Sequence, residues 1–286
     1  GRQASSFSTR PQARMTSVLS MNDTRLFGEP ASPVKILFLG QCLHYGYQGV
    51  GRSVTFPAIA AEQLSARFPH RQIRFDLKYL YHPRGLKALL QHRLLLSSPD
   101  IVVISVPAMF AARHWRVSLL YQFAPEVFDT ARSFLQKIEN RVYRDCSRNL
   151  TALDKAFTVH PPIKLDEYEN LIEQAVLYCL TKSTARPVLI GPGLFNVDTI
   201  EDYAIHSPGL WSAVNAMVLQ LGNRLGIPVI NAQDTLADHD GGVFIPNNHR
   251  WSERGHQIVA LEVERVLAPE ISALGAARTV TSPILT

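Results

Sequence analysis

Apolar residues gather along the chain in five short runs that are typical of buried β-strands. The clearest are Val34–Gly40 and Asp100–Val106, in which almost every position is apolar, as in a strand covered on both faces. Arg71–Leu80 alternates apolar and polar positions, which indicates a half-buried strand. Two shorter runs, Pro187–Ile190 and Pro228–Asn231, complete the set. We therefore predict five strands.

The segments between these runs carry apolar residues at helical spacing. The predicted helices are Ser53–Phe68, Leu86–Leu96, Val117–Arg148, Leu165–Leu180, Pro208–Leu225 and Ser252–Leu267. The last of them begins at a good N-cap residue, Ser252, and its apolar residues fall mostly on one stripe, formed by Ile258, Val259, Leu261, Val263 and Val266. Strands that alternate with helices predict an α/β fold of three α/β/α layers, a flavodoxin-like doubly wound parallel sheet.

No linker rich in Pro, Gly or Ser divides the patterned region, so we expect a single domain. Its expected limits are residues 33–270. Residues 1–32 are rich in Ser, Arg and Thr with little periodic apolar pattern, which predicts a disordered N-terminal tail. Residues 271–286 are expected to form a short C-terminal tail.

The composition excludes several broad classes of protein. Hydrophobic residues make up 46% of the 286 residues and charged residues 19%, which argues against a disordered, collagen-like or polytopic membrane chain. The net charge of +5 is too small and too scattered for a nucleic-acid-binding protein. No run approaches the roughly 20 apolar residues of a membrane span, and the first 30 residues lack a secretory signal, so we expect a cytoplasmic protein. Cys42, Cys146 and Cys179 show no CxxC spacing, which argues against a disulfide framework or a thiolate zinc site.

In open parallel sheets the site lies beyond the carboxyl ends of the strands. That rule directs attention to residues 40–51, 106–115, 191–202 and 234–251. The polar residues Asp234, Asp238, His239 and Asp240 in the last range are better explained by an exposed loop than by a metal site, and we expect no metal and no cofactor. The glycines at 40, 46, 49 and 51 lack the spacing of a dinucleotide fingerprint and the lysine of a P-loop.

Two motifs at opposite ends of the chain belong together. Gly40-Gln41-Cys42-Leu43 follows the first predicted strand, and residues 247–256, Asn-Asn-His-Arg-Trp-Ser-Glu-Arg-Gly-His, lead into the last helix. In this order they resemble the SGNH (GDSL-type) hydrolase family, in which the first strand ends in Gly-Asp-Ser-Leu and an Asp-x-x-His element precedes the last helix. A glycine after the second strand, here Gly85, and Pro99-Asp100 before the third add to the resemblance. It spans about residues 33–267 and implies an SGNH hydrolase-like fold.

The resemblance assigns roles to single residues, and several family side chains are replaced. The nucleophilic serine falls on Cys42 and the oxyanion glycine on Gly85. The oxyanion asparagine falls on Met109. The aspartate and histidine of the last block fall on Asn247 and Arg250.

The substituted residues still suggest a nucleophilic mechanism. A thiol is a better nucleophile than a hydroxyl because part of it ionises near neutral pH, so Cys42 is the candidate nucleophile; the structural alternative is a small buried cysteine. Arg250 remains protonated and cannot act as a base. The neighbouring His249 is the candidate base, with Asn247 or Asn248 orienting its ring, and His44 is a local competitor; either histidine could instead be a solvated or ligand-contacting residue.

The expected pocket combines backbone donors with a largely apolar rim. The backbone N–H groups of Cys42 and Gly85 would form the oxyanion hole, without the side-chain donor that Met109 replaces. The expected substrate-binding residues are His44, Tyr45, Met109, Phe110 and Arg250. These features favour an ester or thioester hydrolase or an acyltransferase that acts on a small acyl substrate or an acyl carrier. The alternative is a catalytically degenerate relative that binds an acylated or carbohydrate ligand. The sequence leaves the oligomeric state open.

Overall fold

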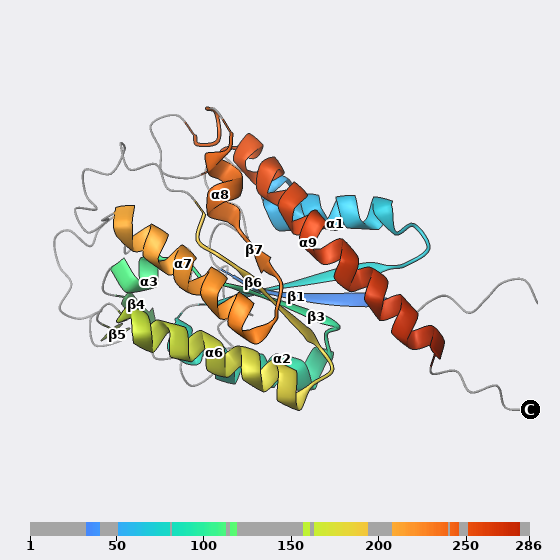
Figure 1. Ribbon diagram of the computed structural model, residues 1–286, viewed down its shortest axis with the longest axis horizontal. Helices are drawn as coiled ribbons and strands as arrows, with labels where there is room; N and C mark the ends of the chain where they lie inside the picture. Colours follow the sequence, from blue (N-terminus) through green and yellow to red (C-terminus); the bar gives the residue numbers. More distant parts are fainter. Residues whose placement is uncertain are drawn as a thin grey trace, which may run out of the picture.

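A parallel five-stranded sheet forms the centre of the protein (Figure 1). The structure is a computed structural model, and it describes residues 33–40, 51–80, 82–112, 115–118, 157–160, 163–193, 208–239, 241–245 and 251–280. The strands are β1 (Val34–Gly40), β2 (Ile73–Tyr79), β3 (Ile101–Ser105), β6 (Arg186–Ile190) and β7 (Val229–Ile230). Their order is β2-β1-β3-β6-β7, and every neighbouring pair is parallel. All five predicted strands and the predicted fold class are confirmed.

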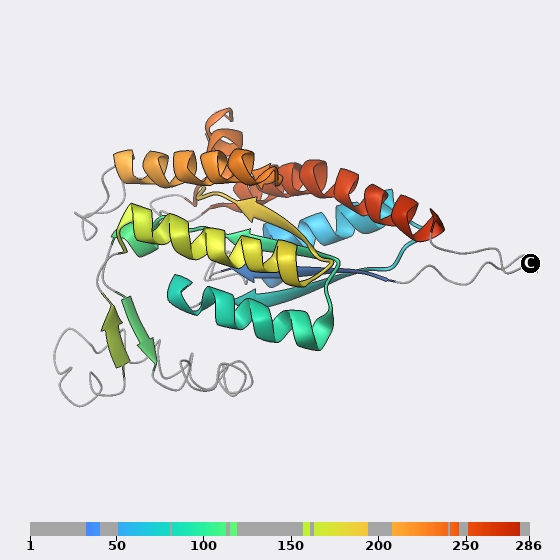
Figure 2. The same ribbon diagram turned by 60° about the horizontal axis from the view of Figure 1, so that its bottom comes forward.

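Helices cover both faces of this sheet, as Figures 1 and 2 show. One face carries α1 (Phe56–Arg67), α8 (Ala232–Ala237) and α9 (Glu253–Val280). The opposite face carries α2 (Leu86–Ser97), α6 (Leu165–Lys182) and α7 (Pro208–Leu225). Three short helices, η2 (Arg52–Val54), η3 (Pro83–Gly85) and α3 (Met109–Ala112), lie in the connections. The bounds of α7 match the prediction, with Pro208 at its start and Gly226, in the left-handed region at φ +63°, just after its end.

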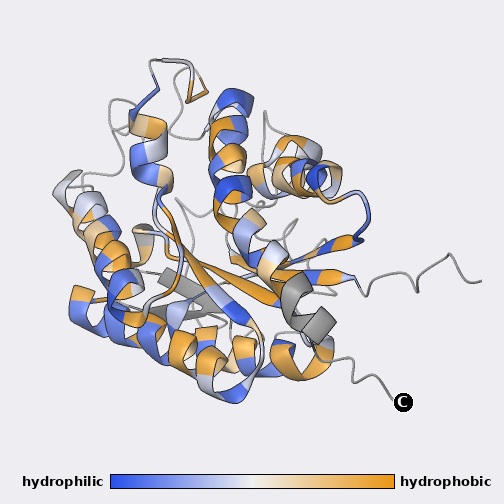
Figure 3. Ribbon diagram, turned by 45° about the vertical axis from the view of Figure 1, so that its right-hand side comes forward, coloured by the Kyte–Doolittle hydropathy of each residue, from blue (hydrophilic) through white to orange (hydrophobic). Residues whose placement is uncertain are grey.

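The core consists of two apolar layers that the strands separate. Alternate residues of β1 point to opposite faces, so Ile36 and Phe38 pack with α1 and α9, while Leu37 and Leu39 pack with α2 and α6. In Figure 3 the central strands are mainly hydrophobic and the helices alternate hydrophobic and hydrophilic turns. The sequences of such strands are continuous apolar runs because both faces of each strand are buried.

A second, two-stranded sheet corrects one of the predictions. β4 (Trp115–Ser118) pairs antiparallel with β5 (Phe157–His160), and Figure 2 shows the pair apart from the main sheet. The helix predicted over Val117–Arg148 is therefore wrong at its first two residues. Residues 119–156, which hold the rest of that prediction, lie outside the described residues. Trp115 and Val117 alternate with polar residues, as in a strand. This four-residue pattern is too short to be distinguished from the long helical pattern that follows it.

The last helix is longer than predicted. α9 continues past Leu267 and past residue 270, where the sequence placed the end of the domain, to Val280. It does so although Pro269 cannot donate a backbone hydrogen bond within the helix. Ile271 in this extension is fully buried, whereas Leu261, expected on the apolar stripe, is 57% exposed. The predicted tail at 1–32 lies outside the described residues.

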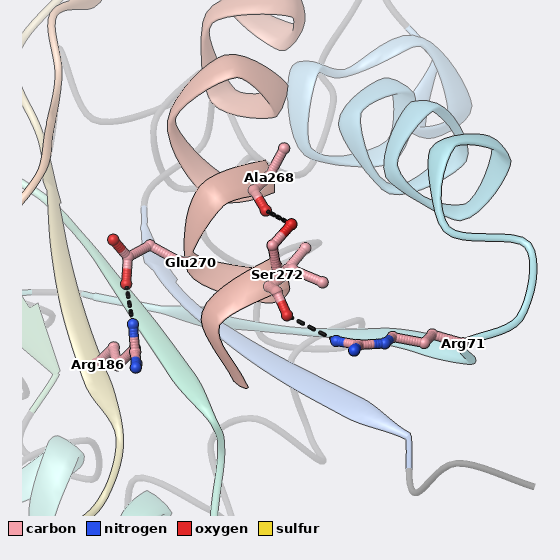
Figure 4. Close-up of polar contacts among 6 residues, drawn as sticks. Arg71, Arg186, Ala268, Glu270 and Ser272 are labelled. Atoms are coloured by element: carbon pink, nitrogen blue, oxygen red, sulfur yellow. Dashed lines mark hydrogen bonds and ion pairs between the residues drawn. The ribbon is translucent and has the colours of Figure 1, made fainter. Parts of the chain in front are cut away.

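Polar contacts attach this extension of α9 to the sheet (Figure 4). Arg186 of β6 forms an ion pair with Glu270 at 2.9 Å, and Arg71, which precedes β2, donates to the carbonyl oxygen of Ile271 at 2.6 Å. Ser272 donates to the Ala268 carbonyl within the helix at 2.9 Å. Arg71 precedes β2 and Arg186 begins β6, on opposite sides of β1 and β3, so the end of α9 crosses the amino-terminal ends of these strands.

The extension should contribute to stability in proportion to what it buries. We expect Ile271→Ala to lower the free energy of unfolding by about 2–5 kcal/mol, the usual cost of truncating a buried Ile. Leu261→Ala on the same helix is the matched control, and it should change stability by less than about 0.5 kcal/mol because Leu261 is exposed. Urea denaturation of the two variants measures the difference. Equal effects would contradict the packing of Ile271 described above.

Candidate active site

The carboxyl ends of the strands meet at one edge of the sheet, and backbone hydrogen bonds continue the pairing there. The N–H of Leu80 donates to Gly40 at 2.6 Å, which joins the ends of β2 and β1. The N–H of Val106 donates to Ile190 at 2.9 Å, which joins β3 and β6. The segments that leave β1, β2, β3 and β6 therefore start side by side, as the edge rule requires.

Gly85 lies at this edge, in the short helix η3 that leads into α2. The Nδ1 atom of His82 accepts a hydrogen bond from the N–H of Arg84 at 3.3 Å, and the Arg84 side chain forms an ion pair with Glu167 of α6 at 2.9 Å. The N–H of Gly85 itself donates to the carbonyl of His82 at 3.0 Å. The expected oxyanion donor is thus engaged within its own turn, and a substrate oxygen at Gly85 would compete with this carbonyl.

Phe110, an expected substrate-binding residue, lies in the core. Its ring is fully buried and makes edge contacts with His82, at 5.5 Å between ring centroids, and with Tyr168 of α6, at 6.2 Å. The Tyr168 hydroxyl donates to the carbonyl of Pro107 at 3.0 Å, and burial raises the pKa of this phenol well above its usual value. Phe110 therefore holds the segment after β3 against η3 and α6. Met109 begins α3 beside it.

Trp251, which directly follows residues 246–250, is packed in the core. Its side chain is only 3% exposed, and its ring lies 5.9 Å from the ring of Phe56 and 5.5 Å from that of His256. A Cβ atom placed on Gly193, just after β6, would lie 1.8 Å from the Trp251 ring. A Cβ on Gly255 would lie 2.4 Å from the carbonyl oxygen of Val243. Only glycine permits these two close approaches.

The start of α9 is capped as the sequence predicts. The Oγ atom of Ser252 accepts from the N–H of Gly255 at 3.2 Å and donates to the carbonyl of Gly242. The N–H of Ser252 donates to Val243 at 2.8 Å. One turn later, His256 is fully buried, and its Nδ1 atom accepts from the N–H of Phe56 at 3.2 Å. His256 thus makes a buried hydrogen bond to the backbone at the start of α1.

The predicted catalytic residues lie in two segments that are next to the described residues in the sequence. Cys42, His44 and Tyr45 fall in residues 41–50, and Asn247, His249 and Arg250 fall in residues 246–250; all six lie outside the described residues. The described structure positions their neighbours: Gly40 and Gly51 flank the first segment, and Ile245 and Trp251 flank the second.

Gly193 and Tyr168 are structural determinants of the site that the sequence patterns did not identify. Gly193 belongs to Gly191-Pro192-Gly193, directly after a buried strand, and glycines in that place often mark a close approach. Tyr168 lies within the predicted helix Leu165–Leu180, and a helical pattern does not show which group its hydroxyl will contact.

Two negative findings concern the described part of the chain. Within it, no group of three or more His, Cys, Asp or Glu side chains is arranged to hold a metal ion. Asp234 instead accepts from the Asn231 amide at 2.7 Å at the start of α8. The helices in the same part of the chain include none that is long and apolar enough to cross a membrane.

Comparison with known proteins identifies the fold. No family model and no curated protein matches the sequence. Among solved structures, a lipase/acylhydrolase from Enterococcus faecalis aligns over 82% of this chain and 96% of its own, with a TM-score of 0.54 and 14% identity. An acetylxylan esterase from Geobacillus stearothermophilus aligns over 82% of this chain and 94% of its own, with a TM-score of 0.53 and 18% identity. A putative lipolytic protein of the G-D-S-L family from Desulfitobacterium hafniense DCB-2 aligns over 82% of this chain and 99% of its own, with a TM-score of 0.51 and 13% identity. The chain thus has the SGNH/GDSL-type hydrolase fold.

The contact between Gly193 and Trp251 can be tested by adding one methyl group. We expect Gly193→Ala to lower the free energy of unfolding by about 1–3 kcal/mol, because the new Cβ would overlap the indole ring and force it to move. Gly51→Ala is the matched control, since a Cβ there meets nothing closer than Ser53 Oγ at 3.9 Å. Thermal unfolding measures both, and an unchanged Gly193→Ala protein would contradict this packing.

Tyr168 should make stability depend on alkaline pH. Its pKa is raised in the folded protein, so its contribution is complete below the unfolded value of about 10 and is lost as the pH rises above that value. Tyr168→Phe should remove about 1 kcal/mol at pH 8, by deleting the hydrogen bond to Pro107, and should flatten the loss of stability above pH 10. Urea denaturation between pH 8 and 11 tests this, and parallel pH curves for variant and wild type would refute it.

Proposed function

We propose that the protein is an acyl hydrolase or acyltransferase that uses Cys42 as its nucleophile. The observation that carries the proposal is that the ends of β1, β2, β3 and β6 meet at the carboxyl edge of an SGNH-type sheet. Gly40, two residues before Cys42, is hydrogen-bonded to the strand end that leads to Gly85. The residue that follows the His249 segment, Trp251, packs on the start of α1.

In the proposed reaction the Cys42 sulfur attacks the carbonyl carbon of an ester or thioester. His249 takes the thiol proton and returns it to the departing alcohol or thiol, which leaves an acyl group on sulfur. Water then releases the acid, or an acceptor hydroxyl or thiol takes the acyl group. Asn247 orients the imidazole. The reducing cytosol keeps thiols free of disulfides, so a cytoplasmic location accompanies the proposal.

Backbone donors supply the oxyanion hole in this mechanism. In this mechanism the N–H of Cys42 would donate a hydrogen bond to the developing charge. The N–H of Gly85 would join it by exchanging the His82 carbonyl for the substrate oxygen. Met109 supplies no side-chain donor, which lowers the expected rate by about two to three orders of magnitude. The substrate should therefore carry an activated acyl group, on a small molecule or an acyl carrier. His44, Tyr45, Met109 and Arg250 would contact it, the last by pairing with an anionic group.

The aligned acetylxylan esterase supports the choice of positions to consider. Three solved structures of the Geobacillus acetylxylan esterase are catalytic mutants in which a serine, a histidine or an aspartate is changed to alanine. At the positions carried over by resemblance, this chain has Cys42, Arg250 and Asn247. Because a guanidinium cannot accept a proton, the base has to be a different side chain, and His249 is adjacent.

Turnover of p-nitrophenyl acetate and of a short acyl thioester tests the mechanism. Cys42→Ala should abolish activity, and His249→Ala should lower kcat by about two to four orders of magnitude, the usual contribution of general acid–base catalysis. Cys42→Ser should keep measurable activity, because a competent base can also activate a hydroxyl. A dead serine variant would instead indicate that Arg250 ionises the thiol. A wild-type protein inactive on every acyl substrate, with ligand affinity unchanged in Cys42→Ala, would favour a binding protein.

Iodoacetamide labelling tests the thiol without any substrate. Cys42 should react with an apparent pKa well below ~8.5, the value of an unperturbed thiol. Cys179 is the internal control: it is buried, its sulfur donates to the Ala185 carbonyl at 3.5 Å, and burial raises its pKa. Mass spectrometry of the two tryptic peptides across pH 5–10 resolves them. Equal, slow labelling of both cysteines would count against the nucleophile.

A further inference from the structure

We propose that His256 is a positioning residue that ties the start of α1 to the start of α9. It thereby joins the two helices that follow, in the sequence, the segments that carry Cys42 and His249. This inference rests on the proposed function and deepens it. His256 lies in α9, outside the segment that holds the proposed base, and its partner Phe56 lies 200 residues away in the sequence.

The hydrogen bond completes the N-terminus of α1. The first residues of a helix have N–H groups without partners inside the helix. Thr55, the N-cap residue, makes no side-chain capping bond, and its carbonyl accepts from Ala58 and Ile59 at 3.0 Å each. Pro57 has no N–H. The remaining donor of this turn is the Phe56 N–H, and His256 accepts it.

Aromatic contacts on both sides hold the imidazole in the orientation that this bond requires. The ring stacks on Phe56 with an interplanar angle of 14° and meets Trp251 at 62°. Trp251 is itself fixed against Gly193. Because Nδ1 accepts a hydrogen, a neutral ring carries its own proton on Nε2. His256 is thus a fixed acceptor inside the core.

The two helices joined here follow the two proposed catalytic segments directly. α1 and η2 follow residues 41–50, and Trp251 and α9 follow residues 246–250. A displacement of α1 against α9 would therefore change the separation of the nucleophile and the base. Misplacing reacting groups by about 1 Å can cost about 10²-fold in rate. A cap that joins these helices therefore affects catalysis although it touches neither substrate nor reacting atoms.

Two variants separate the hydrogen bond from the packing. His256→Phe keeps an aromatic ring and loses the acceptor, whereas His256→Asn keeps an acceptor close to the place of Nδ1 and loses ring contacts. With p-nitrophenyl acetate we expect His256→Phe to lower kcat about 100-fold and to leave KM within about threefold, and His256→Asn to recover at least tenfold of that loss. Leu261→Ala, exposed on the same helix, should keep wild-type kcat. Wild-type kcat in His256→Phe, or an equal loss in both variants, would overturn the inference.

A second readout keeps this test apart from that of the proposed function. Iodoacetamide labelling gives the apparent pKa of Cys42 without turnover. In His256→Phe it should rise toward ~8.5, because the thiol loses its positioned partner, while His256→Asn should stay nearer the wild-type value. Circular dichroism confirms that each variant is folded. A wild-type protein without acyl turnover would overturn the proposed function alone; an unchanged Cys42 pKa in His256→Phe would overturn the positioning role.

Discussion

The burial of β1 on both faces is the constraint on which the rest of the structure depends. Leu37, Phe38 and Leu39 are completely inaccessible, and they can be so only if helices cover the two sides and strands pair along both edges. Parallel pairing requires every connection to cross from one end of the sheet to the other. All the strands therefore release their chains at the same edge, where residues far apart in the sequence become neighbours.

Small residues then decide how closely those neighbours approach. Gly193 and Gly255 lie where a methyl group would overlap Trp251 or the Val243 carbonyl. The indole in turn packs on Phe56 and His256, so the connection after β6, the start of α1 and the start of α9 form one cluster. At this place apolar packing and a buried hydrogen bond act on the same side chains.

The fold and the proposed chemistry are separable in this chain. The scaffold is that of SGNH/GDSL-type hydrolases, although identity to the neighbours described is 13–18%. A scaffold depends on patterning and packing, which many sequences satisfy, whereas an acyl-transfer site depends on proton-accepting and nucleophilic atoms at single positions. At the positions that the resemblance assigns to the serine, aspartate and histidine of SGNH hydrolases, this chain has Cys42, Asn247 and Arg250. The proposed mechanism accordingly moves the base to His249 and relies on backbone donors.

The sequence alone determined the five strands, most of the helices and the order of the layers, because continuous apolar runs and helical spacing are local signals that burial makes strong. It also indicated the cap at Ser252. Only the tertiary structure decided that Phe110 lies in the core, that Gly85 donates to its own turn, and that α9 continues beyond residue 270. The first and third outcomes depend on partners distant in the sequence, Tyr168 and Arg71, and a local pattern contains no information about which residue will occupy the facing position. The Gly85 hydrogen bond depends on the backbone conformation of residues 82–85, which the sequence pattern did not specify.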